Sequence, residues 1–364
     1  MKDLRNLRSS LYAWLDSRVP VSDLIAYFSS KTVPRHKHSF WYYFGGLTLF
    51  FFVVQVVTGI LLSLNYVPTP EQAHESVQTI IRLAPYGWMI RSIHSWCANL
   101  LVASLFVHMF SVFLMKAYRK PRELLWVTGV ILMFLVLGFA FTGYLLPWDT
   151  TAYFATLIGT EVPRSLPIVG DWGVGLLKGG EEIGASTLSR MYSIHTIILP
   201  LTALFMVSFH VLLNQILGTS VPPGTRIKEP PLPFFPNFLY RDFISWILGF
   251  VCLIGLATMV PASLGQQANA LASAPLGIKP EWYFLPLYQT LRLVPASIFS
   301  VSGELLVNLS VMVASAFWAF VPFIDRRSSH EEKSPIFTTI GVLVIVYLVV
   351  TIVLAYVTPQ AGTT

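Results

Sequence analysis

Four histidines lie in two apolar segments of the chain, at spacings that could support chemistry across a membrane. His94 and His108 are 14 residues apart in the first segment, and His195 and His210 are 15 residues apart in the second. In α-helices these intervals correspond to about 21 Å and about 22 Å, and they bring both members of a pair to broadly the same side. If the two helices run parallel as neighbours, they present two stacked pairs of imidazoles within an apolar layer about 30 Å thick.

Two stacked pairs of imidazoles are typical of a protein that holds two haems, because a neutral imidazole is the usual axial ligand of haem iron. One histidine in an apolar helix can be a structural residue, but an unpartnered ionisable group in hydrocarbon costs several kcal/mol. Four histidines in matched positions therefore favour metal ligation. A dihaem anchor of a peripheral dehydrogenase and a haem-free transporter with a histidine proton relay remain alternatives.

The composition indicates a membrane protein with several spans. Of the 364 residues 54% are hydrophobic and 12% are charged, whereas a soluble domain carries about 25% charged residues. The net charge of +6 reflects lysines and arginines in short loops between spans, so it indicates topology and no nucleic-acid partner. Cys97 and Cys252 lie in apolar segments and no CxxCH occurs, so we expect neither a c-type haem nor an iron–sulfur cluster on this chain.

The elements that must position the histidines are membrane helices. We expect an all-α integral membrane protein of about seven transmembrane helices, with a four-helix haem-binding bundle followed by three helices. The predicted spans are residues 40–64, 88–115, 124–146, 190–216, 243–261, 303–323 and 336–357. Two short helices are expected near 150–158 and 171–178.

Three regions follow from this pattern. Residues 1–217 comprise an amphipathic N-terminal segment and the four-helix bundle, and Arg5, Arg8 and Arg18 of that segment should face lipid headgroups. Residues 218–242 form a connection, because the prolines of GTSVPPGTRIKEPPLPFFPN exclude a span. Residues 243–364 form a three-helix C-terminal domain.

Basic residues predict the sidedness of the chain. They gather in the N-terminal region, in KAYRKPRE, in the TRIKE–YRD connection and in FIDRRSSHEEK. An odd number of spans puts all four segments on one side, which the positive-inside rule identifies as the cytoplasmic or N side. The N-terminus should therefore lie on the N side, with His108 and His210 near it and with His94 and His195 near the opposite P side.

Glycines in the first and third predicted spans share the spacing of the histidines. Gly45 and Gly59 are 14 residues apart, as are Gly129 and Gly143. Because small residues permit close approach between membrane helices, we expect these glycines to flank the edges of the haem rings at two depths. The alternative is that they only reflect how common glycine is in membrane helices.

Two charged residues at the predicted P side have possible roles in binding and catalysis. Arg91 lies one turn before His94 and could bind a haem propionate through two hydrogen bonds, or could extend to the interface as a snorkelling side chain. Glu281 lies in an apolar loop, where desolvation raises the pKa of a carboxyl group towards values useful to a base. An ion pair of Glu281 with Lys279 or Arg292 is the structural alternative.

Several motifs resemble the cytochrome b subunit of Rieske/cytochrome b quinol oxidoreductases, the bc- and bf-type complexes. The resemblance runs from about Val33 to about residue 355 and is carried by RSIH, KPRELLWVTGV, GYLLPWD, STLSRMYSIH and PEWYF. Several motifs look closer to the bf-type version, in which a four-helix haem subunit and a three-helix partner are separate chains. Here the two parts appear in one chain, with the junction near 218–240.

The resemblance implies two b haems and a quinol site. His94 with His195 would ligate a lower-potential P-side haem, and His108 with His210 a higher-potential N-side haem. Glu281 matches the proton-accepting carboxylate of the quinol-oxidation pocket, and the other residues that match this pocket are Pro280, Trp282, Tyr283 and Tyr144.

The resemblance also implies the reaction and the partners. Quinol would be oxidised at the P side, with one electron passing to a Rieske iron–sulfur protein and a c-type cytochrome. The other electron would pass through both haems to quinone at the N side, and proton translocation would result. We expect a homodimeric complex with bound lipids in an energy-conserving membrane, here a bacterial cytoplasmic membrane.

Two positions depart from the bf-type pattern. Tyr43 stands where that family has a cysteine that attaches an additional N-side haem, so a thioether is impossible here and a third, non-covalent haem is left open. Gln215 stands where a basic residue is expected after the last ligand. Asp23 and Lys31 are candidates for the N-side quinone site, although both are equally well interpreted as interfacial residues.

Overall fold

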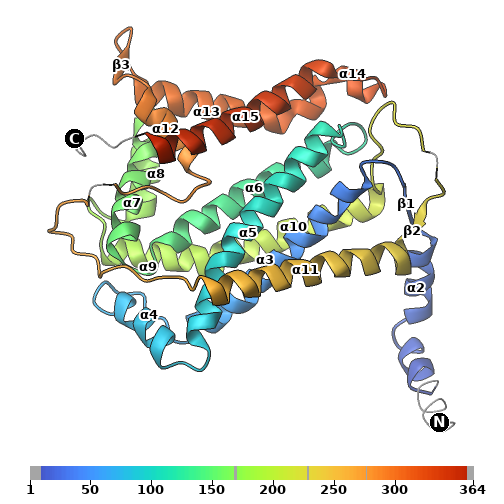
Figure 1. Ribbon diagram of the computed structural model, residues 1–364, viewed down its shortest axis with the longest axis horizontal. Helices are drawn as coiled ribbons and strands as arrows, with labels where there is room; N and C mark the ends of the chain where they lie inside the picture. Colours follow the sequence, from blue (N-terminus) through green and yellow to red (C-terminus); the bar gives the residue numbers. More distant parts are fainter. Residues whose placement is uncertain (1–9, 168–169, 228, 276, 359–364) are drawn as a thin grey trace.

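The computed structural model describes residues 10–167, 170–227, 229–275 and 277–358 and consists mostly of helices (Figure 1). Within these residues seven helical segments are long and apolar enough to cross a membrane, which confirms the predicted fold class. Their bounds are Ser39–Ser63, Gly87–Leu114, Glu123–Tyr144, Ala185–Leu217, Phe234–Met259, Gly303–Ser329 and Pro335–Val357.

These segments form helices because hydrocarbon offers the backbone no other hydrogen-bond partners. The last one, α15 (Pro335–Val357), has 23 residues and no charged side chain. At 1.5 Å per residue it is about 34 Å long, enough to cross the apolar core of a bilayer.

The first four spans are arranged as two packed pairs. Helix α3 (Tyr43–Ser63) packs along α5 (Gly87–Leu114), and α6 (Glu123–Tyr144) packs along α10 (Leu199–Leu217). Within the described residues α5 and α10 do not pack closely against each other. The fifth span, α11 (Leu239–Met259), covers α3 and α5 and buries Leu253 and Ala257 there.

The last two spans attach to this bundle through aromatic side chains. Helix α13 (Gly303–Ile324) packs against α6, and α15 packs against α5 and the short helix α12 (Leu285–Leu293). Phe113 stacks on Trp318 with ring centres 4.1 Å apart. The indole nitrogen of Trp126 also donates to the carbonyl of Trp318 at 2.8 Å, so α5, α6 and α13 meet in one buried cluster.

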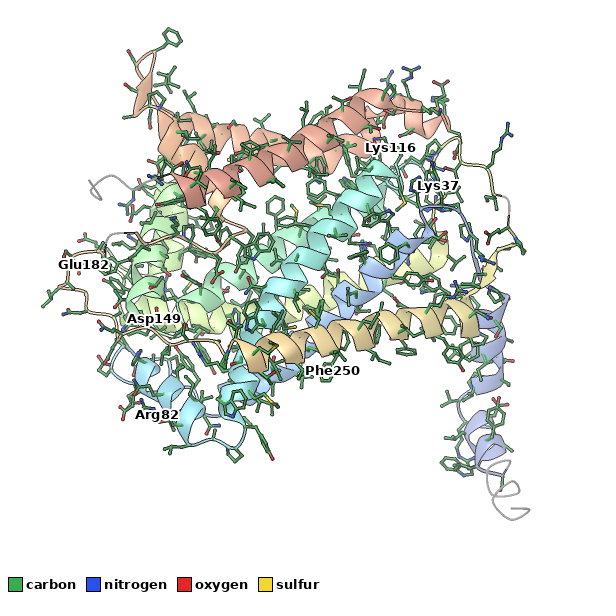
Figure 2. The ribbon with its side chains drawn as sticks, viewed as in Figure 1. Lys37, Arg82, Lys116, Asp149, Glu182 and Phe250 are labelled. Carbon is green, nitrogen blue, oxygen red and sulfur yellow. The ribbon has the colours of Figure 1, made fainter. Side chains whose placement is uncertain are left out.

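The loops gather at two opposite ends of the spans (Figures 1 and 2). The end that carries α2 (Val21–Ser30), α14 (Arg326–Ser329) and the paired strands β1 (Thr32–Val33) and β2 (Leu232–Pro233) is called the N-terminal end here. The other, called the C-terminal end, carries α4 (Ala73–Arg82), α7 (Thr150–Glu161), η2 (Val162–Ser165), α8 (Gly170–Lys178) and the β3–β4 hairpin (Ser297–Ile298 with Val301–Ser302). Figure 2 shows Lys37 and Lys116 at the N-terminal end and Asp149 and Glu182 at the C-terminal end.

Most predicted elements are present, two spans begin earlier than predicted, and one helix was not predicted. Helices α7 and α8 confirm the two short helices expected after the third span. The fourth span begins earlier than predicted, because α9 (Ala185–Ser193) continues through η3 (Ile194–Ile198) into α10. The fifth span includes η4 (Phe234–Phe238), but Phe235 has an extended backbone, so the continuous helix starts at Pro236, where a proline is tolerated in the first turn. Helix α4 was not predicted.

The N-terminal segment is partly described. Arg5 and Arg8 lie outside the described residues, and the guanidinium of Arg18 lies 4.3 Å from the ring centre of Trp14. Helix α2 runs at a steep angle to the spans (Figure 1) and packs on η4, with the Phe28 and Phe234 rings 5.9 Å apart. This orientation suits a helix that lies along the membrane surface.

Candidate functional site

The histidines of α5 lie against the glycines of α3. A Cβ atom placed on Gly59 would be 3.3 Å from Cε1 of His94, and one placed on Gly45 would be 3.0 Å from Cε1 of His108. Both contacts are tighter than an ordinary van der Waals approach. The two glycines therefore leave room for the imidazoles at two levels of the bundle.

The second helix pair repeats this arrangement. A Cβ on Gly143 would be 2.5 Å from Cε1 of His195, and one on Gly129 would be 3.2 Å from Cε1 of His210. Glycines and histidines share an interval because each glycine faces one imidazole. In sequence the four glycines were expected at the edges of haem rings, and in the structure their closest side-chain neighbours are these imidazoles.

One histidine from each helix pair meets at the level nearer the C-terminal end. The ring centres of His94 and His195 are 6.4 Å apart and their planes are inclined by 74°. A bond from a metal to an imidazole nitrogen is about 2 Å long and the ring centre lies about 1 Å beyond, so two axial imidazoles on one metal have centres about 6 Å apart. The observed separation therefore fits a single metal between the two rings.

Threonines set the orientation of three of the four imidazoles. Nδ1 lies 2.9 Å from the Thr58 hydroxyl in His94, 2.9 Å from that of Thr128 in His210, and 3.2 Å from that of Thr142 in His195. Each threonine immediately precedes one of the glycines. These threonines were not predicted, although the repeated Thr–Gly dipeptide was a visible signal.

The hydroxyl geometry assigns the protons. The Thr58 hydroxyl donates its only proton to the carbonyl of Val54 at 2.7 Å, so its oxygen must accept a proton from the imidazole. Thr128 and Thr142 donate to backbone carbonyls in the same way. Each of these imidazoles then carries its proton on Nδ1 and has the Nε2 lone pair available as a ligand.

A pair of imidazoles is a donor set that haem proteins use. Within the described residues no three side chains of the His, Cys, Asp and Glu types gather as ligands. His94 and His195 would hold a haem through their Nε2 atoms, and the haem would supply one-electron redox chemistry. His108 and His210 lie within electrostatic reach of each other at the second level.

Arg91 contacts the polypeptide in this structure. Its guanidinium donates to the carbonyls of Ala262 at 2.5 Å and Ser263 at 2.8 Å. These bonds fix the start of the long connection after α11 to the beginning of α5. A role of Arg91 in propionate binding stays a prediction.

The PEWYF segment is fixed against α5 at the C-terminal end. The Trp282 indole donates to Oδ1 of Asn99 at 2.8 Å, and its ring centre lies 6.2 Å from that of Phe106. Tyr283 packs beside Trp282 with ring centres 5.4 Å apart. Asn99, which lies five residues after His94 and was not singled out in the sequence, therefore positions this segment.

Glu281 is half-buried, and burial raises the pKa of its carboxyl group. Burial, and then the charges of Glu281 and Tyr144, also raise the pKa of the Tyr283 phenol. The three predicted pocket residues Glu281, Tyr283 and Tyr144 thus lie within electrostatic reach of one another. A carboxylate that is poorly solvated and close to two phenols can accept a proton from a hydroxylated ring.

The predicted ion-pair alternative for Glu281 is not observed. Among the described residues Glu281 forms no ion pair. The Lys279 ammonium lies 5.4 Å from the ring centre of Tyr356, and the Arg292 guanidinium lies 5.8 Å from that of Tyr288.

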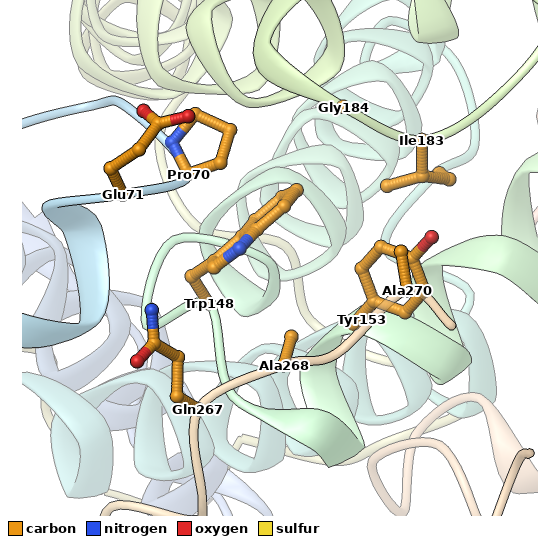
Figure 3. A pocket seen from close by; sticks show the side chains of 9 residues that line it. All are labelled: Pro70, Glu71, Trp148, Tyr153, Ile183, Gly184, Gln267, Ala268 and Ala270. Carbon is orange, nitrogen blue, oxygen red and sulfur yellow. The ribbon is translucent and has the colours of Figure 1, made fainter. Parts of the chain in front are cut away.

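A separate cavity of about 360 Å³ opens at the same end of the molecule (Figure 3). Trp148 and Tyr153 form part of its wall, and the remaining lining residues come from the segments before α4 and α9 and from the connection after α11. None of the predicted haem or quinol residues lines this cavity.

Asp242 lies close to α3 at the level of His108, nearer the N-terminal end. A Cβ atom on Gly46 would collide with its carboxylate, and Gly46 follows the glycine that contacts His108. Oδ1 of Asp242 is buried and has no hydrogen-bond partner within the described residues. No sequence pattern selects Asp242, because its approach to α3 depends on how α11 packs.

The other residues considered for the N-terminal end have different surroundings. The Lys31 ammonium donates to Oε1 of Gln215 at 3.0 Å and to its carbonyl at 2.7 Å. Tyr43 stacks on Phe238 with ring centres 5.0 Å apart. Asp23 lies in the first turn of α2.

Comparison with known proteins identifies similar chains. Residues 28–217 match the family described as Cytochrome b/b6/petB, and residues 267–364 match the family described as Cytochrome b(C-terminal)/b6/petD. The cytochrome b subunit of a cytochrome bc complex from Chlorobaculum thiosulfatiphilum is 49% identical over 349 residues, which cover 94% of this chain and 80% of that relative.

Two further comparisons concern a shorter relative and a solved structure. Cytochrome b6 from Synechococcus sp. (strain RCC307) is 44% identical over 215 residues, which are 59% of this chain and 98% of that protein. A chain of the structure described as "Hyperthermophilic respiratory Complex III" superimposes with a TM-score of 0.84 at 27% identity, covering 95% of this chain and 91% of that one.

Proposed function

This chain belongs to the cytochrome b/b6 family, as a subunit of a bc- or b6f-type quinol oxidoreductase, and we propose that it carries two b haems across the membrane. His94 with His195 would hold one haem, and His108 with His210 the other. The 6.4 Å separation of the His94 and His195 ring centres, with both Nδ1 atoms hydrogen-bonded, supports this most directly. When bound, the haems would supply one-electron redox centres at two depths of the bilayer.

Optical spectra of the purified complex test this proposal. Reduced-minus-oxidised spectra of the wild type should contain two b-type components, and His94→Ala should remove one of them. His330→Ala is the matched control, because the exposed His330 ring is outside the bundle and lies 2.7 Å from the carbonyl of Arg326. A colourless wild-type chain, or a His94→Ala variant that keeps both components, would contradict the proposal.

The sidedness proposed here follows the basic residues. The N-terminal end carries Lys37 and Lys116 (Figure 2) together with the basic segments that precede α6, flank β2 and follow α13. By the positive-inside rule this end faces the cytoplasm, the N side of a bacterial cytoplasmic membrane. The C-terminal end, with the PEWYF segment, would then face the P side.

At the P side we propose that the chain binds and oxidises quinol. The Glu281 carboxylate would accept a proton from the quinol hydroxyl, and Tyr144 and Tyr283 would line the pocket beside it. Asn99 would hold Trp282, and with it the loop, against α5. Quinol gives up two electrons and two protons, so one electron would leave to a Rieske iron–sulfur protein and the other across the membrane.

At the N side we propose that quinone is reduced next to Asp242. Its buried, unpartnered carboxylate oxygen beside Gly46 supports this assignment. Reduction of a quinone consumes protons, and a carboxyl group at this position could deliver one. Uptake at the N side and release at the P side would together translocate protons.

The remaining partners and the regional division follow from the same function. A Rieske protein and a c-type cytochrome would receive the electron released at the P side, and the complex would be a homodimer with bound lipids. We propose that residues 1–217 hold the haems, that 218–242 connect, and that 243–364 supply the quinol-site loop.

A further inference from the structure

The hydrogen bonds to the four imidazoles are not equivalent. His94, His195 and His210 each donate from Nδ1 to a threonine hydroxyl, and His195 has the carbonyl of Phe139 at 3.1 Å as a second acceptor. Nδ1 of His108 is buried and has no partner within the part of the chain that the structure describes. In the P-side pair both histidines thus have a hydrogen-bond acceptor at Nδ1, whereas in the N-side pair only His210 has one.

The two levels differ in one residue of α3. Thr58 precedes Gly59 at the P-side level, whereas Phe44 precedes Gly45 at the N-side level. The Phe44 ring packs against Phe40 and Trp41, with ring centres 5.8 Å and 5.7 Å apart. The residue before the glycine therefore has a hydroxyl at the level of His94 and no side-chain oxygen at the level of His108.

A hydrogen bond from Nδ1 changes what the imidazole does to a bound metal. When Nδ1–H donates to an acceptor, electron density moves towards Nε2 and the ring becomes a more basic ligand. A more basic axial ligand stabilises the oxidised, more positive iron and so lowers its reduction potential. An imidazole without an acceptor lacks this effect.

We propose that Thr58, Thr128 and Thr142 are positioning residues that lower the reduction potential of the haem they face, and that Phe44 raises the potential of the N-side haem by leaving His108 without an acceptor. The inference rests on the proposed function, because it requires both haems to be bound. An electron moves from the P-side haem to the N-side haem because the N-side haem has the higher reduction potential. Part of that difference in reduction potential would then come from the hydroxyl that is missing at position 44.

An isosteric pair of variants at position 44 tests the proposal. Phe44→Thr restores the Thr–Gly dipeptide, and Phe44→Val has the same shape without the oxygen. Optical redox titration of the purified complex should show a lower N-side midpoint in Phe44→Thr than in Phe44→Val, and an equal P-side midpoint. A tenfold change in the one-electron equilibrium corresponds to about 59 mV, which such titrations resolve.

Variants at the threonines test the same effect in reverse. Thr58→Val should raise the P-side midpoint, whereas Thr58→Ser keeps the hydroxyl and should restore the wild-type value. Thr142→Val should have a smaller effect than Thr58→Val, because the Phe139 carbonyl still accepts from His195. If the variants at position 44 do not fold, the threonine variants still show whether a hydroxyl at Nδ1 lowers the midpoint potential.

The outcomes separate this inference from the proposed function. A wild-type complex without b-type spectra would overturn the proposed function itself. Two bound haems whose midpoints are the same in Phe44→Thr and Phe44→Val, or in Thr58→Val and Thr58→Ser, would overturn the inference and leave haem binding intact.

Discussion

Among the four glycines that face the histidines, Gly143 is the one where an added methyl group should come closest to an imidazole. In Gly143→Ala the new Cβ would lie 2.5 Å from Cε1 of His195, a distance that real contacts do not reach. The imidazole cannot simply turn away, because Nδ1 is held by Thr142 and by the Phe139 carbonyl. Overpacking of this kind costs about 1–3 kcal/mol, which corresponds to roughly 5- to 150-fold weaker binding of a group ligated by His195.

Haem content per chain in the purified complex measures this effect, with the P-side spectral component followed separately. Gly59→Ala is a graded comparison, since its Cβ would lie 3.3 Å from His94 and a small shift would relieve the contact. Gly255→Ala is the control, because nothing lies within 4 Å of a Cβ on this glycine of α11. A Gly143→Ala complex with full P-side haem content and an unchanged P-side midpoint would refute the packing argument.

Three further predictions concern the quinol, quinone and loop contacts. Glu281→Gln should keep both haems and slow quinol turnover roughly 100-fold or more; unchanged turnover would remove Glu281 from the mechanism. Burial raises the pKa of Glu281, and only the deprotonated carboxylate accepts a proton. On acidification, wild-type turnover should therefore begin to fall at a pH above the ordinary pKa of glutamate. The Gln variant should lack that limb of the pH profile. Asp242→Asn should slow reoxidation of the N-side haem by quinone in stopped-flow spectra without affecting electron transfer to the Rieske protein. Tyr118→Phe removes a buried 2.6 Å hydrogen bond to the Asp325 carboxylate, so thermal unfolding in detergent should reveal a loss of about 1.5–3 kcal/mol; an unshifted unfolding temperature would contradict this.

The spans were predictable because they depend on local composition. A helix such as α15 has no charged side chain and must satisfy its backbone internally, whatever surrounds it. The candidate ligands were predictable for a related reason: helical periodicity alone puts His94 and His108 on one side of α5.

The rest depends on contacts between distant segments. Helix α4 is short and polar, and it forms where it buries Val77 and Ile80 against its neighbours. Asp242 became a candidate only through the packing of α11 on α3, and Asn99 only through its bond to Trp282. The Thr–Gly dipeptides could have been found in the sequence, but a threonine in a membrane helix usually bonds to its own backbone, so the second partner was not evident.

The distribution of the candidate ligands over the two helix pairs determines where the chain could be divided into separate polypeptides. All four candidate ligands and the four glycines lie before Gly218, while α11 lies after it and packs on α3 and α5. Covalent continuity after α10 is therefore not needed to build the redox core, and a relative that aligns with only 59% of this chain can still contain all of it. A break between α3–α5 and α6–α10 would instead leave each fragment with one histidine of each proposed haem pair.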